Sequence, residues 1–127
     1  LMPERRPNIL SSSLRYKKRY IAYKIICDKD MEFSELSNAM WHSILDYLGE
    51  KFAAEARVWI LKSTFDPKTR TGLIRTSHIG TENVRAALSF VQKVKDEKVI
   101  VQALGVSGTI KAANQKFFGH RDLRSFS

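Results

Sequence analysis

The residues best suited to chemistry lie in one short run near the end of the chain, where two glycines and two hydroxyl side chains precede a lysine. The run is Gly105-Val-Ser-Gly-Thr-Ile-Lys111, and it follows a β-branched segment. Glycine permits backbone conformations that a side chain would block, and Ser107 or Thr109 can cap a following helix whose free N–H groups then face a docked anion. This is the layout of a phosphate cradle, but taken alone the run favours a tight strand-to-helix turn, and only the charge of the rest of the chain reverses that order.

No other group of residues in the sequence has the spacing of a catalytic or metal site. Asp28 and Asp30 form a pair of acids in the turn after the first strand, where solvated acids are ordinary, and no histidine is near them in the sequence. We therefore interpret them as solvated side chains rather than a Mg²⁺ site. Cys27 is the only cysteine, and its apolar setting predicts a small core residue rather than a nucleophile. The histidines are far apart in sequence, at His42, His78 and His120. The sequence therefore predicts no catalytic side chain, no metal and no cofactor bound by this chain.

The positive charge of the chain is concentrated at its two ends. The formal net charge is +9; residues 1–24 hold seven basic side chains and one acidic, residues 105–127 hold four and one, and the residues between hold eleven of each. This asymmetry favours a polyanion as partner, and nucleic acid rather than membrane, because the basic tracts lack the apolar face of an interfacial helix. Two solubilising tails are the alternative.

Length and hydropathy predict one α/β domain in a cytoplasmic protein without a membrane span or a signal peptide. We expect residues 1–14 to form a flexible basic arm, residues 15–119 a single domain, and residues 120–127 a basic tail. Strands are expected at 20–27, 57–65, 73–78 and 98–104. Helices are expected to begin at Ser34 and at Thr81, the second with Val94 on its inward face, and a last helix at 109–118.

The element order β-α-β-β-α-β predicts a ferredoxin-like α+β sandwich with a four-stranded antiparallel sheet and an extra C-terminal helix. We expect the first and third strands to lie parallel in the middle, with the fourth antiparallel beside the first. The glycine-rich run, the start of the first strand and the 66–72 hairpin should then meet at one edge. The predicted RNA-binding residues are Arg15, Lys17, Lys18, Arg19, Lys68, Arg70, Ser107, Gly108, Thr109, Lys111 and Lys116.

The open face of this sheet is not expected to stack on bases. The third strand has no aromatic residue, and alternation lets only one of Tyr20 and Tyr23 face outward. Trp41 and Trp59 both lie in apolar patterns and are expected in the core. Recognition should therefore use the nucleic-acid backbone and shape. The face has partly apolar spacing, as at Ile26 and Ile60, and is an alternative docking place for another protein.

Four segments of the chain resemble one known family, in the same order and spacing from residue 14 to residue 118. They are Leu14-Arg-x-Lys-Lys-Arg-Tyr-Ile-Ala-Tyr-Lys-Ile-Ile26, Trp59-x-Leu-Lys62, Thr71-Gly-Leu-Ile-Arg75 and Leu104-Gly-Val-Ser-Gly-Thr-Ile-Lys111. The last segment is the most specific. Together they are similar to protein component 2 of archaeal ribonuclease P, the small RNA-binding subunit shared with the eukaryotic enzyme, which has a counterpart in ribonuclease MRP.

The resemblance implies an RRM-like α/β sandwich that is a subunit of an endoribonuclease whose chemistry is carried by its RNA. This subunit would bind the catalytic domain of the ribonuclease P RNA and pair with the barrel-shaped protein component 3, two copies of each forming a heterotetramer. The RNA, with its bound Mg²⁺, would remove the 5′ leader from precursor tRNA. Two alternatives stay open, a general RNA-binding ferredoxin-like module and a small-ligand regulatory domain of the same fold. Retention on a tRNA column that fades with salt would separate the last from the others.

Overall fold

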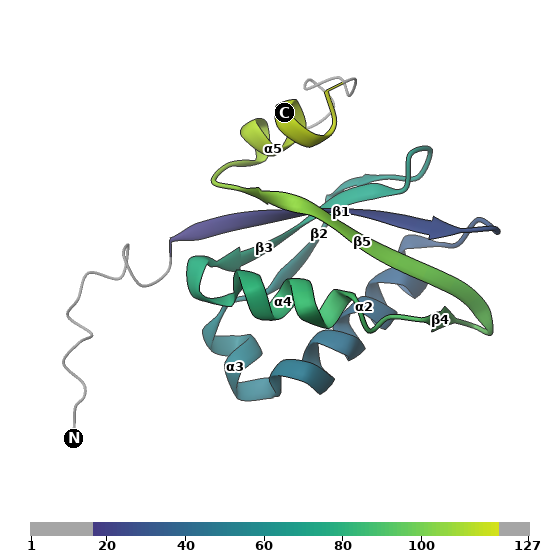
Figure 1. Cartoon of the computed structure of the whole chain (residues 1–127), viewed down its shortest axis with the longest axis horizontal. Coiled ribbons are helices and arrows are strands. Elements are labelled where there is room, and N and C mark those ends of the chain that lie inside the picture. The colour runs from purple at the N-terminus through teal and green to yellow at the C-terminus, as the bar shows by residue number, and fades with distance from the viewer. Residues whose placement is uncertain (1–16, 120–127) are drawn as a thin grey trace.

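A computed structural model describes residues 17–119, in which helices cover both faces of an antiparallel sheet (Figure 1). The strands are β1 (Lys18–Cys27), β2 (Trp59–Asp66), β3 (Thr71–Ser77), β4 (Lys93–Val94) and β5 (Glu97–Ser107). The helices are α2 (Phe33–Leu48), α3 (Glu50–Glu55), α4 (Thr81–Leu88) and α5 (Ile110–Phe117), with a 3₁₀ turn η3 (His78–Gly80) before α4. The expected α+β class and the last helix are confirmed. The expected basic arm (1–14), its neighbour Arg15 and the basic tail (120–127) lie outside the described residues.

The sheet has the strand order β2-β3-β1-β5-β4, and every pairing in it is antiparallel. The expectation that the first and third strands run parallel is wrong. After the α2–α3 crossover β2 runs in the direction of β1, and β3 returns from β2 between the two, so β3 is antiparallel to both. This reversal decides which end of the sheet the β2–β3 hairpin occupies.

A short fifth strand stands where the second helix was expected to continue. Helix α4 ends at Leu88 in tight backbone bonds, from Phe90 N–H to the Ala87 carbonyl and from Val91 N–H to the Leu88 carbonyl (3.1 and 3.2 Å). The chain then forms β4 and turns back through Lys95 and Asp96, both with positive φ (50° and 68°). Such paired left-handed residues match the twist of a two-residue hairpin. Val94 still reaches the core, but as a strand residue.

The main core lies between the sheet and helices α2 and α4 (Figure 1). Alternate residues of β1, namely Ile21, Tyr23 and Ile25, point into this layer and are buried. Buried residues of the two helices meet them, including Leu36, Met40, Ile44, Val84 and Leu88. The spacing of these positions by three and four residues gives each helix one apolar stripe.

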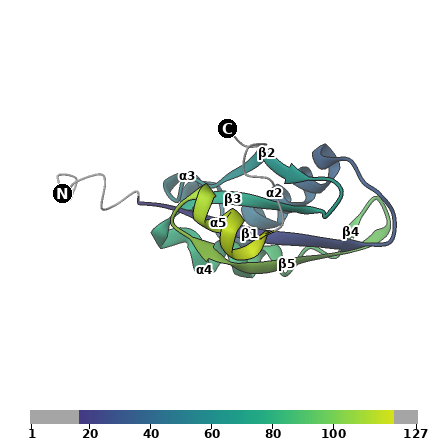
Figure 2. The same ribbon diagram turned by 90° about the horizontal axis from the view of Figure 1, so that it is seen from above.

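Helix α5 packs on the opposite face of the sheet, above β1 and β5 (Figure 2). Ala22 and Leu73, which pair across β1 and β3, form a second small core with Ala113 and Phe118. The sheet face away from α2 and α4 is therefore partly covered rather than fully open. No helix among residues 17–119 is long and apolar enough to cross a membrane.

Candidate nucleic-acid interface

The turn between β5 and α5 is built by a threonine cap. Thr109 has an extended backbone (φ −142°), and its Oγ1 accepts a hydrogen bond from the Ala112 N–H at 3.0 Å. This bond satisfies one of the free N–H groups at the start of α5. Ser107, the other candidate cap, instead ends β5 opposite Tyr20 of β1. The strand-to-helix layout is confirmed, and Thr109 rather than Ser107 is the residue that caps the helix.

The two glycines of this run have different surroundings. A Cβ atom built on Gly105 would lie 2.4 and 2.5 Å from atoms of the Phe117 ring, so this glycine lets α5 pack closely on the sheet. A Cβ atom on Gly108 would meet nothing within 4 Å. Gly105 therefore has a packing role, which favours the strand-to-helix turn for this half of the run. Gly108 is exposed beside the start of α5, where an anion has room to approach.

The start of β1 and the end of β5 lie side by side, as the sequence predicted. We call the basic residues at this end of the sheet, Lys17, Lys18, Arg19 and Lys111, the basic edge. Tyr20 pairs with Ser107, which brings the basic start of β1 beside the β5–α5 turn (Figure 1). Lys17 and Lys18 are exposed there, while Arg19 is half-buried and donates a hydrogen bond to the Lys18 carbonyl at 2.8 Å. Lys111 is exposed in the first turn of α5. Lys116 lies in the last turn, with its ammonium nitrogen 5.4 Å from the centre of the Phe117 ring.

The β2–β3 hairpin lies at the other end of the sheet, so Lys68 and Arg70 do not join this edge as expected. Because β3 is antiparallel to β1, its first residue, Thr71, pairs with Lys24, and the Arg70 carbonyl accepts from the Ile25 N–H at 2.8 Å. The Arg70 guanidinium is 2.6 Å from the Asp30 carboxylate and also donates to the Cys27 carbonyl. The hydrogen bond with Asp30 raises the pKa of Arg70 above its ordinary value.

The acid pair that follows β1 consists of Asp28 and Asp30. Asp30 forms an ion pair with Arg70. Within residues 17–119 no group of three or more histidine, cysteine or acidic side chains is arranged to hold a metal ion.

One exposed aromatic residue was wrongly assigned to the core. Trp41 does pack partly against the core, but Trp59 is 61% exposed. Trp59 begins the edge strand β2 and pairs with Arg75, so it shares the face that carries Leu61 and α5. The available signal was the alternation of side chains along a strand. Ile60 packs toward the main core, so its neighbours Trp59 and Leu61 face away from it.

Two basic residues that are not among the predicted RNA-binding residues, Arg57 and Arg75, lie near this tryptophan. Together with Lys18, Thr76 and Ser77 they line a pocket of about 270 Å³ at the start of β1 and the end of β3. On the face carrying α5, Ser107, Tyr20, Arg75 and Trp59 follow one another across β5, β1, β3 and β2. The basic edge thus continues across the sheet to an exposed aromatic ring.

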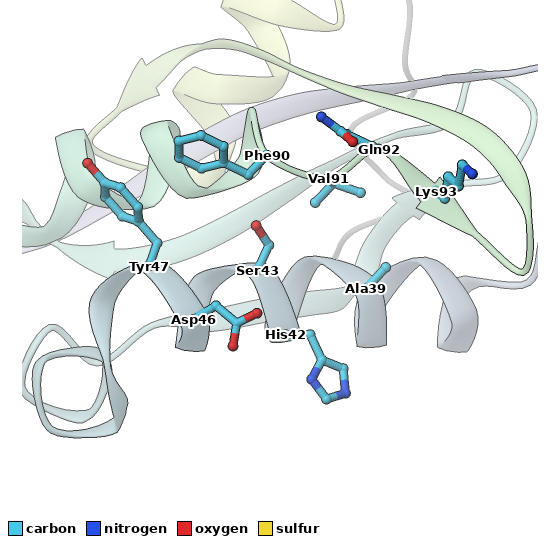
Figure 3. A pocket seen from close by; sticks show the side chains of 9 residues that line it. All are labelled: Ala39, His42, Ser43, Asp46, Tyr47, Phe90, Val91, Gln92 and Lys93. Carbon is cyan, nitrogen blue, oxygen red and sulfur yellow. The ribbon is translucent and has the colours of Figure 1, made fainter.

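Apolar surface is exposed at two further places. Ile26 pairs with Ile100, and the two are 46% and 49% exposed, so the expectation for Ile26 is confirmed while Ile60 lies on the other face. On the helical side, a hollow of about 440 Å³ separates α2 from the segment after α4 (Figure 3). Tyr47 and Phe90 form its apolar end, with ring centres 5.4 Å apart. This hollow lies on the opposite side of the sheet from α5.

Comparisons with known proteins give a consistent set of relatives. Residues 19–118 match the Rpp14/Pop5 family. The protein named ribonuclease P protein component 2 of Pyrococcus furiosus is 41% identical over 91% of this chain and 98% of its own length. The protein of the same name from Methanocaldococcus jannaschii is 34% identical over 87% and 79%. Among solved structures, a chain in the cryo-EM structure of yeast ribonuclease MRP aligns over 75% of this chain and 76% of its own at 13% identity and a TM-score of 0.44, too weak a likeness to support an argument.

Proposed function

The chain belongs to the Rpp14/Pop5 family, and on that premise we propose that it is the ribonuclease P subunit that binds the RNA of the enzyme and activates it for 5′-leader removal from precursor tRNA. The observation that carries the proposal is the 41% identity with a protein named ribonuclease P protein component 2 over nearly the full length of that protein. The family predicted from the four sequence segments is therefore confirmed.

The basic edge supports the part of the proposal that concerns RNA. Lys17, Lys18 and Lys111 are exposed on one side of the sheet, next to the open backbone at Gly108. Exposed ammonium groups neutralise phosphates without reading bases, which suits a protein that holds a folded RNA. The RNA, rather than any side chain of this protein, is proposed to hold the Mg²⁺ ions and to carry the chemistry.

The family and its named relatives imply an RNA-containing complex with other protein subunits. The finer arrangement is a proposal: contact with the catalytic domain of the RNA, pairing with the barrel-shaped protein component 3, and a heterotetramer with two copies of each protein, in the cytoplasm. The mass of the complex formed by the two purified proteins tests the stoichiometry. A stable one-to-one complex would contradict the 2:2 arrangement.

Reconstitution tests the function. The purified protein alone should not cut precursor tRNA, whereas addition of ribonuclease P RNA, Mg²⁺ and the partner protein should give 5′ cleavage. Leaving this protein out of the mixture should lower the cleavage rate at limiting Mg²⁺, because its cations lower the repulsion between RNA phosphates. Equal rates with and without the protein would refute the proposal. Cleavage by the protein alone, after removal of contaminating RNA, would refute the assignment of the chemistry to RNA.

A further inference from the structure

The pocket between β1, β3 and the turn after α3 is lined by three cations and two hydroxyl side chains. They are Lys18, Arg57, Arg75, Thr76 and Ser77, and none of the acidic residues between positions 17 and 119 lines the pocket. Lys18 and Ser77 are paired across β1 and β3, so they lie directly opposite each other at one end of the sheet. A small pocket with this lining suits a phosphate group, which offers several acceptor oxygens and negative charge.

The backbone around the pocket is held firmly. The Ala56 carbonyl accepts hydrogen bonds from the Ser77 N–H at 2.7 Å and from the Thr76 Oγ1 at 3.1 Å. The turn after α3 is thereby tied to the end of β3. Arg57 follows directly and has φ 55°, the left-handed conformation that is usual just past a helix end and that favours glycine. Arg57 therefore keeps a conformation that favours glycine, and it lines the pocket together with Lys18 and Arg75.

Ser77 gives an independent indication of a ligand. The residue is 2% exposed, and within the described part of the chain its Oγ has no hydrogen-bond partner. A buried hydroxyl without a partner has a cost in free energy that a bound acceptor would remove. A phosphate oxygen held by the neighbouring cations is such an acceptor.

The exposed Trp59 ring adjoins this pocket. Arg57 and Arg75 also line a second hollow of about 470 Å³, in which Trp59 is a wall. Arg75 and Trp59 are paired across β3 and the edge strand β2. The other walls of the second hollow come from α2 and α3, including Trp41, Leu45 and Ala53, so the hollow lies where these helices meet the edge of the sheet. Glu50 lines the second hollow but not the first. The charges therefore place an anion in the first pocket and leave the second, with its aromatic wall, for an uncharged ring.

We propose that the two hollows form a subsite for one unpaired RNA nucleotide. Its phosphate is bound by Lys18, Arg57 and Arg75 and accepts a hydrogen bond from Ser77, and its base stacks on Trp59. A base inside a duplex is already stacked on its neighbours, so only a base turned out of a helix can cover the indole. The identity of the RNA, that of ribonuclease P, rests on the proposed function; the chemistry of the subsite does not.

Tryptophan fluorescence tests the subsite directly. The full chain contains two tryptophans, so Trp41→Phe leaves Trp59 as the only indole and keeps an aromatic ring at the core. We expect a short oligouridylate to quench the fluorescence of this variant, and the duplex that it forms with oligoadenylate to quench it far less. Trp59→Ala should weaken binding of the single strand about tenfold. Equal quenching by both RNAs, or by neither, would overturn the proposal.

Charge variants test the phosphate pocket. Arg57→Gly and Arg75→Ala should each weaken single-strand binding and lower the slope of log affinity against log salt by about 0.7. Arg57→Gly is informative because glycine suits the backbone at this position, so a loss of binding with an unchanged or higher melting temperature cannot come from unfolding. Lys93→Ala is the matched control, an exposed cation in β4 at the far edge of the sheet, and should change neither quantity. Wild-type affinity and slope in both pocket variants would refute the pocket.

The two proposals can fail separately. If the variants lose single-strand binding but the wild-type protein does not activate ribonuclease P RNA, the proposed function is wrong and the subsite stands. The subsite is wrong and the function stands if the wild-type protein activates the RNA and the three variants behave like it. These variants are Trp59→Ala, Arg57→Gly and Arg75→Ala, and they would then activate the RNA equally well and bind single strands without loss.

Discussion

Replacing Gly105 by alanine tests whether the glycine-rich run is built for packing or for a ligand. The new Cβ would lie 2.4 Å from Cζ and 2.5 Å from Cε1 of Phe117, about 1 Å less than the optimal carbon–carbon separation. Overpacking of this kind costs about 1–3 kcal/mol. Phe117 is half-buried and its ring can move partly toward solvent, and the loss of glycine freedom in the unfolded chain returns about 0.4–1 kcal/mol. Taken at the middle of both ranges, the net destabilisation should be about 1.3 kcal/mol.

Thermal unfolding of the full chain, followed by circular dichroism, measures this effect. A destabilisation of this kind lowers the melting temperature by about 4 °C for each kcal/mol in a chain of this length. Gly108→Ala is the matched control, because its Cβ meets nothing within 4 Å, and its melting temperature should stay the same or rise slightly. In a Phe117→Ala background, Gly105→Ala should cost nothing, since the clashing ring is absent. A Gly105→Ala protein as stable as the wild type would refute the packing role.

Three further outcomes follow from other parts of the structure. Gly108→Val should keep the melting temperature while lowering activation of ribonuclease P RNA, because a side chain there meets no protein atom but would keep a phosphate away; a parallel fall of stability and activity would contradict this. Changing Lys17, Lys18 and Arg19 together to alanine should weaken binding to all RNAs alike and lower the salt slope by about 0.7 to 0.9 for each phosphate that is no longer neutralised, measured with cognate and unrelated RNA; an unchanged slope would mean that these residues only solvate the chain. The hydrogen bond from Lys95 lowers the pKa of Glu35 below its ordinary 4.5. The pair therefore stabilises the fold above that pH and loses its effect as the pH falls through the lowered pKa. The difference in melting temperature between wild type and Glu35→Gln should be present at pH 7 and absent in strong acid, and a difference that grows in acid would refute the assignment.

The success of the sequence-based predictions depended on how local each signal was. The expected helix cap is a local feature, and of the two candidates, Ser107 and Thr109, it is Thr109 that forms it. Alternation along β1 is also local: Tyr23 is buried in the main core, whereas Tyr20 lies on the other face of the sheet. The pairing of Tyr20 with Ser107 followed from the position of the last strand beside the first. These features need only residue spacing and the order of the elements.

The errors concern features that depend on how strands are placed relative to one another. Lys68 and Arg70 were assigned to the wrong end of the sheet because the direction of β3 was reversed. Trp59 was expected in the core because an apolar neighbourhood does not show that a strand lies at the edge of the sheet. Arg57 and Arg75 are isolated in sequence and are brought together by the Ala56–Ser77 contact and by the pairing of Trp59 with Arg75, which no spacing rule predicts.

The position of β1 between β3 and β5 has a consequence for how the protein is made. On the ribosome, β1 emerges first but lacks one of its two neighbours until residues 97–107 have left the exit tunnel, because β5 is the last strand of the described chain. Until then one side of the central strand exposes unpaired backbone groups, which are a template for pairing with other chains. Contacts between residues so far apart in sequence also slow folding. A nascent chain arrested before β5 is thus the form most prone to aggregate, and the yield of folded protein should depend on how quickly that final strand is synthesised.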